Sequence, residues 1–106
     1  RKGAYIVTGS DEQFDVILVA SGSEVSTCVA GAELLRKDGV KVRVVSVPSE
    51  GLFRRQSKEY QEQILPRDAK VFGLNSFGFS APYTVLDEKL GFTPENVYNQ
   101  VKAFLA

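Results

Sequence analysis

The turn Ser21-Gly22-Ser23 carries the residue types most suited to ligand chemistry. It follows the apolar run 16–20 and precedes a segment whose apolar residues recur at helical spacing. A strand, a tight turn and a helix N-terminus together form a common phosphate site, because free N–H groups and the helix dipole favour an anion. Ser46 ends a second apolar run, so it could join Ser21 at the carboxyl edge of a parallel sheet, as could Ser76. Ser21, Gly22, Ser23 and Ser46 are therefore the candidate anion site.

Two features of this turn favour a purely structural role. Neither the dinucleotide fingerprint G-x-G-x-x-G nor the phosphate loop G-x-x-x-x-G-K-[ST] is present, since Gly22 is the only glycine of the turn. Glu24 would place a negative charge at the positive end of the helix, where it repels a phosphate. We expect Ser23 to cap the helix, Glu24 to complement its dipole and Gly22 to make the turn. The missing fingerprint also excludes a nicotinamide-dependent oxidoreductase.

No combination of residues predicts catalysis or metal binding. The chain has no His, which removes the commonest general base and metal ligand. Cys28 is the single cysteine and is expected to fill a small space in the core. The adjacent carboxylates and arginines are typical of solvated surface: Asp11-Glu12, Asp87-Glu88 and Arg54-Arg55. We assign no catalytic, cofactor-binding or metal-binding residue to this chain.

Composition narrows the classes of partner. Thirteen basic and thirteen acidic residues among 106 give a formal net charge of zero, so we expect neither nucleic acid nor an anionic membrane surface as a partner. No apolar run approaches the length that spans a bilayer. A single cysteine suits a reducing compartment, which favours the cytoplasm and leaves an organelle open. The chain contains no Met, so we expect either a piece of a longer protein or a chain whose start has been removed.

The elements that must position these residues alternate between strands and helices. The patterns predict strands over 5–8, 15–20, 41–47 and 69–74, helices over 23–37, 57–65 and 81–89, a loop or single turn over 49–56, and a last helix capped by Thr93 with Pro94 in its first turn. Ser57 is the expected cap of the helix 57–65, and Gly39 ends the helix 23–37. A strand–helix–strand crossover implies parallel neighbours. The fold class is therefore α/β, a three-layer arrangement with a mostly parallel sheet between helices.

Several sequence blocks, in order and over nearly the whole chain, resemble the C-terminal domain of transketolase. The blocks are residues 2–7 (KGAYIV), 15–25 (DVILVASGSEV), 42–49 (VRVVSVPS), 52–53 (LF), Gln56, Tyr60, 64–66 (ILP), 77–82 (FGFSAP) and 91–97 (GFTPENV). Dihydroxyacetone synthases share the same module, so the resemblance leaves the sugar and the acceptor open.

The resemblance implies a specific role for residues 1–106 as one domain. Transketolases use thiamine diphosphate and Mg²⁺ to move a two-carbon ketol unit between sugar phosphates of the pentose phosphate pathway. Their cofactor, metal and substrate sites lie in the two preceding domains, at a homodimer interface. We expect this chain to be a non-catalytic, structural domain, with a regulatory role left open. Its partners would be the preceding domains and the homodimer partner. The alternative is a stand-alone α/β module that binds a small phosphate-containing ligand at the strand carboxyl ends.

One departure from the family pattern follows Pro66. In the family, another strand and helix come between this proline and the strand that leads to the Phe-Gly-x-Ser-Ala-Pro block. Here residues 67–68 lead directly into the apolar run 69–74. About twenty residues, one β-α unit, are missing. Either the shortened sheet repacks, or residues are present in the molecule that this sequence does not contain.

Overall fold

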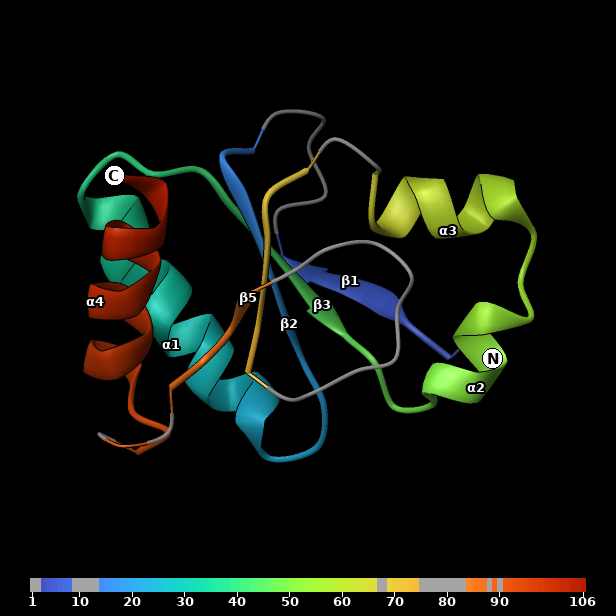
Figure 1. Cartoon of the computed structure of the whole chain (residues 1–106), viewed down its shortest axis with the longest axis horizontal. Coiled ribbons are helices and arrows are strands. Elements are labelled where there is room, and N and C mark those ends of the chain that lie inside the picture. Colours follow the sequence, from blue (N-terminus) through green and yellow to red (C-terminus); the bar gives the residue numbers. More distant parts are fainter. Residues whose placement is uncertain (1–2, 9–13, 67–68, 75–83, 88, 90) are drawn as a thin grey trace.

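A mixed sheet lies at the centre of the computed structural model (Figure 1), which describes residues 3–8, 14–66, 69–74, 84–87, 89 and 91–106. Its strands are β1 (Tyr5–Thr8), β2 (Val16–Ala20), β3 (Val42–Ser46), β4 (Val71–Gly73) and β5 (Thr84–Val85), and its helices are α1 (Glu24–Lys37), α2 (Glu50–Arg54), α3 (Lys58–Ile64) and α4 (Pro94–Leu105). The strand order is β1-β3-β2-β4-β5. β1 runs antiparallel to β3, whereas the other pairs are parallel. The predicted α/β class with a mostly parallel sheet is confirmed.

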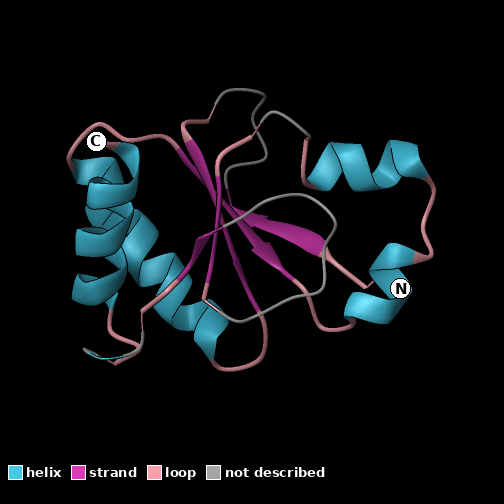
Figure 2. Cartoon of the chain, viewed as in Figure 1, coloured by secondary structure: helices cyan, strands magenta, loops and turns pink. Residues whose placement is uncertain are grey.

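Helices cover both faces of the sheet (Figure 2), α1 and α4 on one side and α2 and α3 on the other. Successive side chains of β2 alternate between the two faces and are all buried, which explains its unbroken apolar sequence. The core on the α1 and α4 face includes Val16, Leu18, Val44, Phe72, Cys28, Leu35, Val97 and Val101. The core on the α2 and α3 face includes Ile17, Val19, Val45, Val71, Phe53 and Ile64.

The strand–helix–strand unit from β2 to β3 forms as predicted. Val16 to Ala20 pair in parallel with Val42 to Ser46, and α1 makes the crossover. Gly22 has a φ of +60° and Gly39 a φ of +86°, a conformation that suits glycine at the start and end of such a helix. Cys28 is fully buried, as expected for a small core residue.

Two of the three predicted helix caps are confirmed. The Ser57 side chain accepts a hydrogen bond from Tyr60 N, and the Thr93 side chain accepts one from Asn96 N. The cap predicted at Ser23 is wrong, because Ser23 already has helical dihedral angles and makes no side-chain cap bond. A capping hydroxyl needs an extended backbone that aims it at the free N–H groups of the first turn.

The helix predicted over 81–89 is wrong where it can be compared. Residues 81–83, 88 and 90 lie outside the described residues, but Thr84–Val85 form β5 and pair with Phe72 and Gly73. The pairing continues at Leu86, whose N–H donates to Gly73 O at 2.8 Å. β-branched residues beside an available strand edge favour this outcome over a helix. The loop or single turn predicted over 49–56 contains α2, a single helical turn capped by the Ser49 side chain.

The sheet has no gap between its central strand β2 and β4, the strand that follows Pro66. β4 pairs directly with β2, through Ile17 with Val71, Leu18 with Phe72 and Val19 with Gly73. Hydrogen bonds extend the ladder at both ends, from Ile17 N to Lys70 O at 2.9 Å and from Leu74 N to Val19 O at 2.8 Å. Both edges of β2 are therefore paired, so the central strand is not exposed in the described sheet.

Candidate functional site

The structure brings the predicted anion-site residues to one edge of the sheet. Ser21 directly follows β2, and Ser46 is the last residue of β3, in register with Ala20. Ser46 is 5% exposed, whereas Gly22 and Ser23 are exposed on the turn. Ser76 lies outside the described residues. The sheet topology alone accounts for this gathering, because parallel strands end at the same edge.

The first turn of α1 offers little to an anion in this conformation. The N–H groups of Glu24 and Val25 donate to Ser21 O and Gly22 O, each at 3.3 Å. The Ser23 hydroxyl donates a hydrogen bond to the Glu24 carboxylate, with 3.4 Å between the two oxygens. An anion would have to displace the turn hydrogen bonds and meet the charge of Glu24. The geometry favours a chain reversal, and anion binding at these residues stays a prediction.

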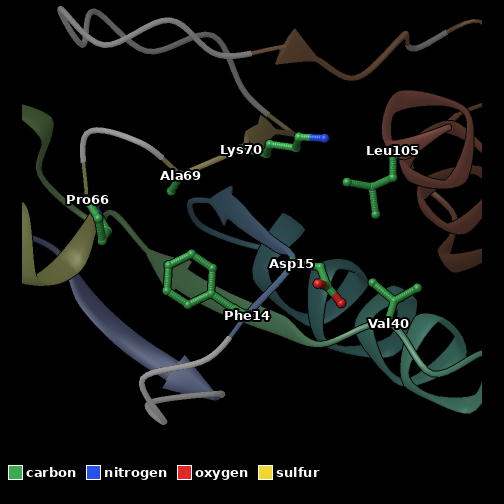
Figure 3. Close-up of a pocket in the computed structure, with 7 residues that line it drawn as sticks. All are labelled: Phe14, Asp15, Val40, Pro66, Ala69, Lys70 and Leu105. Atoms are coloured by element: carbon green, nitrogen blue, oxygen red, sulfur yellow. The ribbon is translucent and has the colours of Figure 1, made fainter.

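A cavity of about 570 Å³ lies at the opposite end of the sheet, where the parallel strands begin (Figure 3). It is lined by Phe14, Asp15, Val40, Pro66, Ala69, Lys70 and Leu105. The sequence reasoning did not find these residues. The sequence does contain one signal for this site: the charged residues Asp15 and Lys70 stand immediately before the apolar runs that form β2 and β4. Volumes of about 300–1,000 Å³ are usual for small-molecule sites.

Backbone contacts fix the carboxylate of Asp15 at this cavity. Asp15 Oδ2 accepts a hydrogen bond from Lys41 N at 2.9 Å, and Lys41 O accepts from Asp15 N at 2.7 Å and from Val16 N at 3.3 Å. This reciprocal pairing ties the start of β2 to the residue before β3. The carboxylate is therefore held by the sheet itself rather than by a mobile loop.

The buried Arg43 holds a second wall of the cavity. Its guanidinium lies 4.5 Å from the centre of the Phe14 ring and donates to Gln63 O at 2.9 Å and Ile64 O at 3.3 Å. Burial of the Arg43 guanidinium lowers its pKa from the usual value. The cation thus joins β3 to the end of α3 and fixes one face of Phe14. Sequence reasoning read Arg43 only as part of a strand.

The described residues include no cluster of metal-ligating side chains: they contain no group of three or more Asp, Glu, Cys or His side chains placed to hold a metal ion. Cys28 is also unsuited to nucleophilic chemistry, because burial raises the pKa of its thiol to about 12.

None of the helices in the described part of the chain has both the length and the apolar character that a membrane-spanning helix requires.

Comparison with known proteins places this architecture in one family. Residues 3–72 match the family described as the transketolase-like C-terminal domain. The transketolase of Staphylococcus epidermidis is 42% identical over 97% of this chain, which corresponds to 19% of that relative. That alignment runs over 125 positions but includes about 103 residues of this chain, which is 97% of 106, so about 22 positions are gaps in this chain, close to the length of one β-α unit.

Solved structures agree with the sequence matches. Transketolase from Pichia stipitis in complex with sedoheptulose 7-phosphate has a TM-score of 0.83 and is 32% identical, over 98% of this chain and 18% of that one. A split-gene transketolase, an inactive β4 tetramer, shares the fold with a TM-score of 0.72 at 20% identity, over 99% of this chain and 42% of that one. The chain spans about a fifth of the length of the curated relatives it matches. This chain therefore belongs to the family of transketolase-like C-terminal domains.

Proposed function

We propose that the chain is the C-terminal domain of a cytoplasmic enzyme that transfers a two-carbon ketol unit between sugar phosphates. The observation that carries the proposal is the 42% identity to a transketolase over 97% of the chain. The solved Pichia stipitis relatives include complexes with sugar phosphates, which supports that substrate class. We assign this substrate class to the chain because of its family, and not because the chain has a substrate site of its own.

The proposed role of the chain is structural, with the chemistry supplied by preceding domains. Thiamine diphosphate would provide the carbanion that carries the two-carbon unit, and it would bind with Mg²⁺ outside this chain. The absence of His from the sequence and the raised pKa of the buried Cys28 thiol support this division. A regulatory role of the domain is compatible with it.

The surface near β1 supports a partner domain, and a homodimeric parent enzyme remains part of the proposal that rests on the family alone. Tyr5 is 54% exposed and Val7 36% exposed on this strand, and Leu52 of α2 is 39% exposed. Exposed apolar side chains are typical of surfaces that another domain covers. Gly3 O accepts a hydrogen bond from Ser49 N at 3.1 Å, and Ala4 O accepts one from the Tyr60 hydroxyl at 2.7 Å. The segment before β1 is thus fixed on α2 and α3, and the preceding domain would pack beside it.

Cofactor binding tests this division directly. Calorimetric titration of the chain with thiamine diphosphate and Mg²⁺ should give no binding isotherm. The complete Staphylococcus epidermidis transketolase, titrated under the same conditions, is the positive control. Stoichiometric binding to the 106-residue chain would contradict the proposal that the cofactor site lies elsewhere.

The second candidate function is a small phosphate-binding module at the carboxyl ends of β2 and β3. Ser21 and Ser46 end neighbouring parallel strands, and Gly22 makes a tight turn between Ser21 and α1. Inorganic phosphate that binds the folded chain would raise its melting temperature, by an amount that grows as RT ln(1 + [L]/Kd). A shift that disappears in Ser46→Ala and increases in Glu24→Gln would support this function. An unchanged melting temperature in millimolar phosphate or sugar phosphate would dispose of it.

A further inference from the structure

The cavity at the amino end of the sheet has the composition of a binding site for a zwitterion with an apolar body. Five of its seven lining residues are apolar: Phe14, Val40, Pro66, Ala69 and Leu105. The two charged residues, Asp15 and Lys70, have opposite signs. Figure 3 shows their side chains on different walls of the cavity, Lys70 on the strand segment that enters β4 and Asp15 on the segment that enters β2.

The two charges are available to a ligand. Neither Asp15 nor Lys70 makes a salt bridge within the described part of the chain, although both line one cavity. The Asp15 carboxylate accepts one backbone hydrogen bond, at Oδ2, which leaves further acceptor positions on its two oxygens. The backbone groups nearby are used within the sheet, since Lys70 O accepts from Ile17 N and Lys41 O accepts from Asp15 N. Recognition at this cavity would therefore rest on the two side-chain charges.

The sign of these charges selects the class of ligand. A simple anion would be attracted by Lys70 and repelled by Asp15, and a simple cation would meet the reverse. A molecule that carries both an ammonium and a carboxylate satisfies both residues and remains neutral overall. An apolar side chain on that molecule would contact Phe14, Val40 and Leu105, and these contacts would remove part of its apolar surface from water.

We propose that this cavity binds an apolar α-amino acid, with its ammonium at Asp15, its carboxylate at Lys70 and its side chain against Phe14, Val40 and Leu105. The site is separate from the ketol-transfer chemistry and from the candidate anion site at the carboxyl edge. Both charges are solvent-exposed, so each ion pair should change affinity by no more than about fivefold. Binding should accordingly be weak, with a Kd of the order of millimolar.

Titration of the isotopically labelled 106-residue chain, followed by amide NMR, tests the proposal. L-Leucine is the probe, and three analogues each lack one feature: L-leucinamide lacks the carboxylate, 4-methylpentanoate lacks the ammonium, and glycine lacks the apolar body. L-Leucine should shift the amide signals of Phe14, Asp15, Val40 and Lys70 together. Each analogue should bind several-fold more weakly.

Two charge-removing variants assign the contacts. Lys70→Gln should weaken L-leucine about threefold and leave L-leucinamide unchanged. Asp15→Asn keeps an oxygen that can accept from Lys41 N, and it should weaken L-leucine while leaving 4-methylpentanoate unchanged. Lys58→Gln, an exposed lysine of α3 outside the cavity lining, is the matched control and should change nothing. The amide spectrum of each variant reports whether it is folded.

Three results would overturn the proposal. One is the absence of signal changes at the cavity in tens of millimolar L-leucine. Another is equal affinity for L-leucine and 4-methylpentanoate, which would make the site one for carboxylates alone. The third is equal weakening by Lys58→Gln, which would mean that net charge and not the cavity governs binding. None of these outcomes bears on the cofactor titration, so failure here is distinguishable from failure of the proposed function.

Discussion

The contact between α1 and α4 gives a sharp test of the packing on one face of the sheet. Gly31 lies on α1 where α4 crosses it, and a methyl group added there would come within 2.8 Å of Val97 Cγ1 and 2.9 Å of Val97 Cβ. Carbon atoms pack best at about 3.5–4.0 Å, so the helices would have to separate by more than half an ångström. Val97 and Val101 are fully buried, so this movement disturbs the core beneath α4.

Two opposing effects decide the outcome of Gly31→Ala. Alanine favours the helix over glycine by about 1 kcal/mol. Overpacking a filled core costs about 1–3 kcal/mol, and the upper part of that range applies because a valine side chain cannot rotate away easily. We expect a net loss of about 1 kcal/mol in the free energy of unfolding. For a domain of this size, that loss lowers the melting temperature by about 4–8 °C.

The same substitution at Gly51 is the matched control. Gly51 lies in α2, and no atom lies within 4 Å of the position that its Cβ would take. Gly51→Ala should therefore be neutral or raise stability by about 0.5 kcal/mol. Urea unfolding of both variants, followed by circular dichroism, measures the difference. A Gly31→Ala variant as stable as Gly51→Ala would refute the close approach of α1 and α4.

A double variant shows whether Val97 is the cause. Val97→Ala alone removes buried methyl groups and should cost about 2 kcal/mol. In Gly31→Ala/Val97→Ala the new methyl group partly occupies the space that the valine leaves. The two losses should then sum to more than the loss of the double variant, by about 1 kcal/mol. Strict additivity would mean that the clash lies elsewhere.

Three further results are expected. The Cys28 thiol, buried and with a pKa raised to about 12, should resist a thiol reagent at pH 8 until the chain unfolds, and rapid labelling of the native chain would contradict its burial. The Tyr98 hydroxyl donates a hydrogen bond to the Asp38 carboxylate and lowers the pKa of that carboxyl. The hydrogen bond therefore stabilises the folded chain above the usual Asp pKa of about 3.9, and this stabilisation is lost as the pH falls through the lowered pKa. Acid unfolding of Asp38→Asn should lack this component. Gly3→Ala should lower the free energy of unfolding in urea by about 1–3 kcal/mol, because Gly3 has a φ of +86° and an added Cβ would lie 2.3 Å from Ser49 O. An unchanged free energy of unfolding would mean that residue 3 does not pack against the start of α2.

The sequence predicted those elements in which several local signals agree. The unit from β2 to β3 combines two continuous apolar runs with a helix bounded by Gly22 and Gly39, so its parallel pairing followed. Ser57 and Thr93 cap their helices as predicted because each side chain reaches an N–H three residues away. The family resemblance rested on sequence blocks that include 15–25, 42–49 and 91–97, and it was confirmed.

The remaining features depend on contacts that a local pattern does not contain. Ser23 resembles a cap in sequence, but helical dihedral angles at that residue turn its hydroxyl toward Glu24. Thr84–Val85 form β5 because β4 offers them an edge, although their neighbours suggest a helix. The cavity draws its walls from several separate segments, so only the fold brings Phe14, Lys70 and Leu105 together.

A domain graft tests the central claim, that the chain is a folded, non-catalytic C-terminal domain of a ketol-transferring enzyme. The C-terminal fifth of the Staphylococcus epidermidis transketolase would be replaced by this chain, which is 42% identical to it over 97% of its own length. Circular dichroism and cofactor titration would first establish that the graft is folded and loaded. Ketol transfer with a kcat within a few-fold of the unmodified enzyme is the predicted result. A folded, cofactor-loaded graft without transfer activity would contradict the claim, because the replaced domain would then supply a group that the reaction needs.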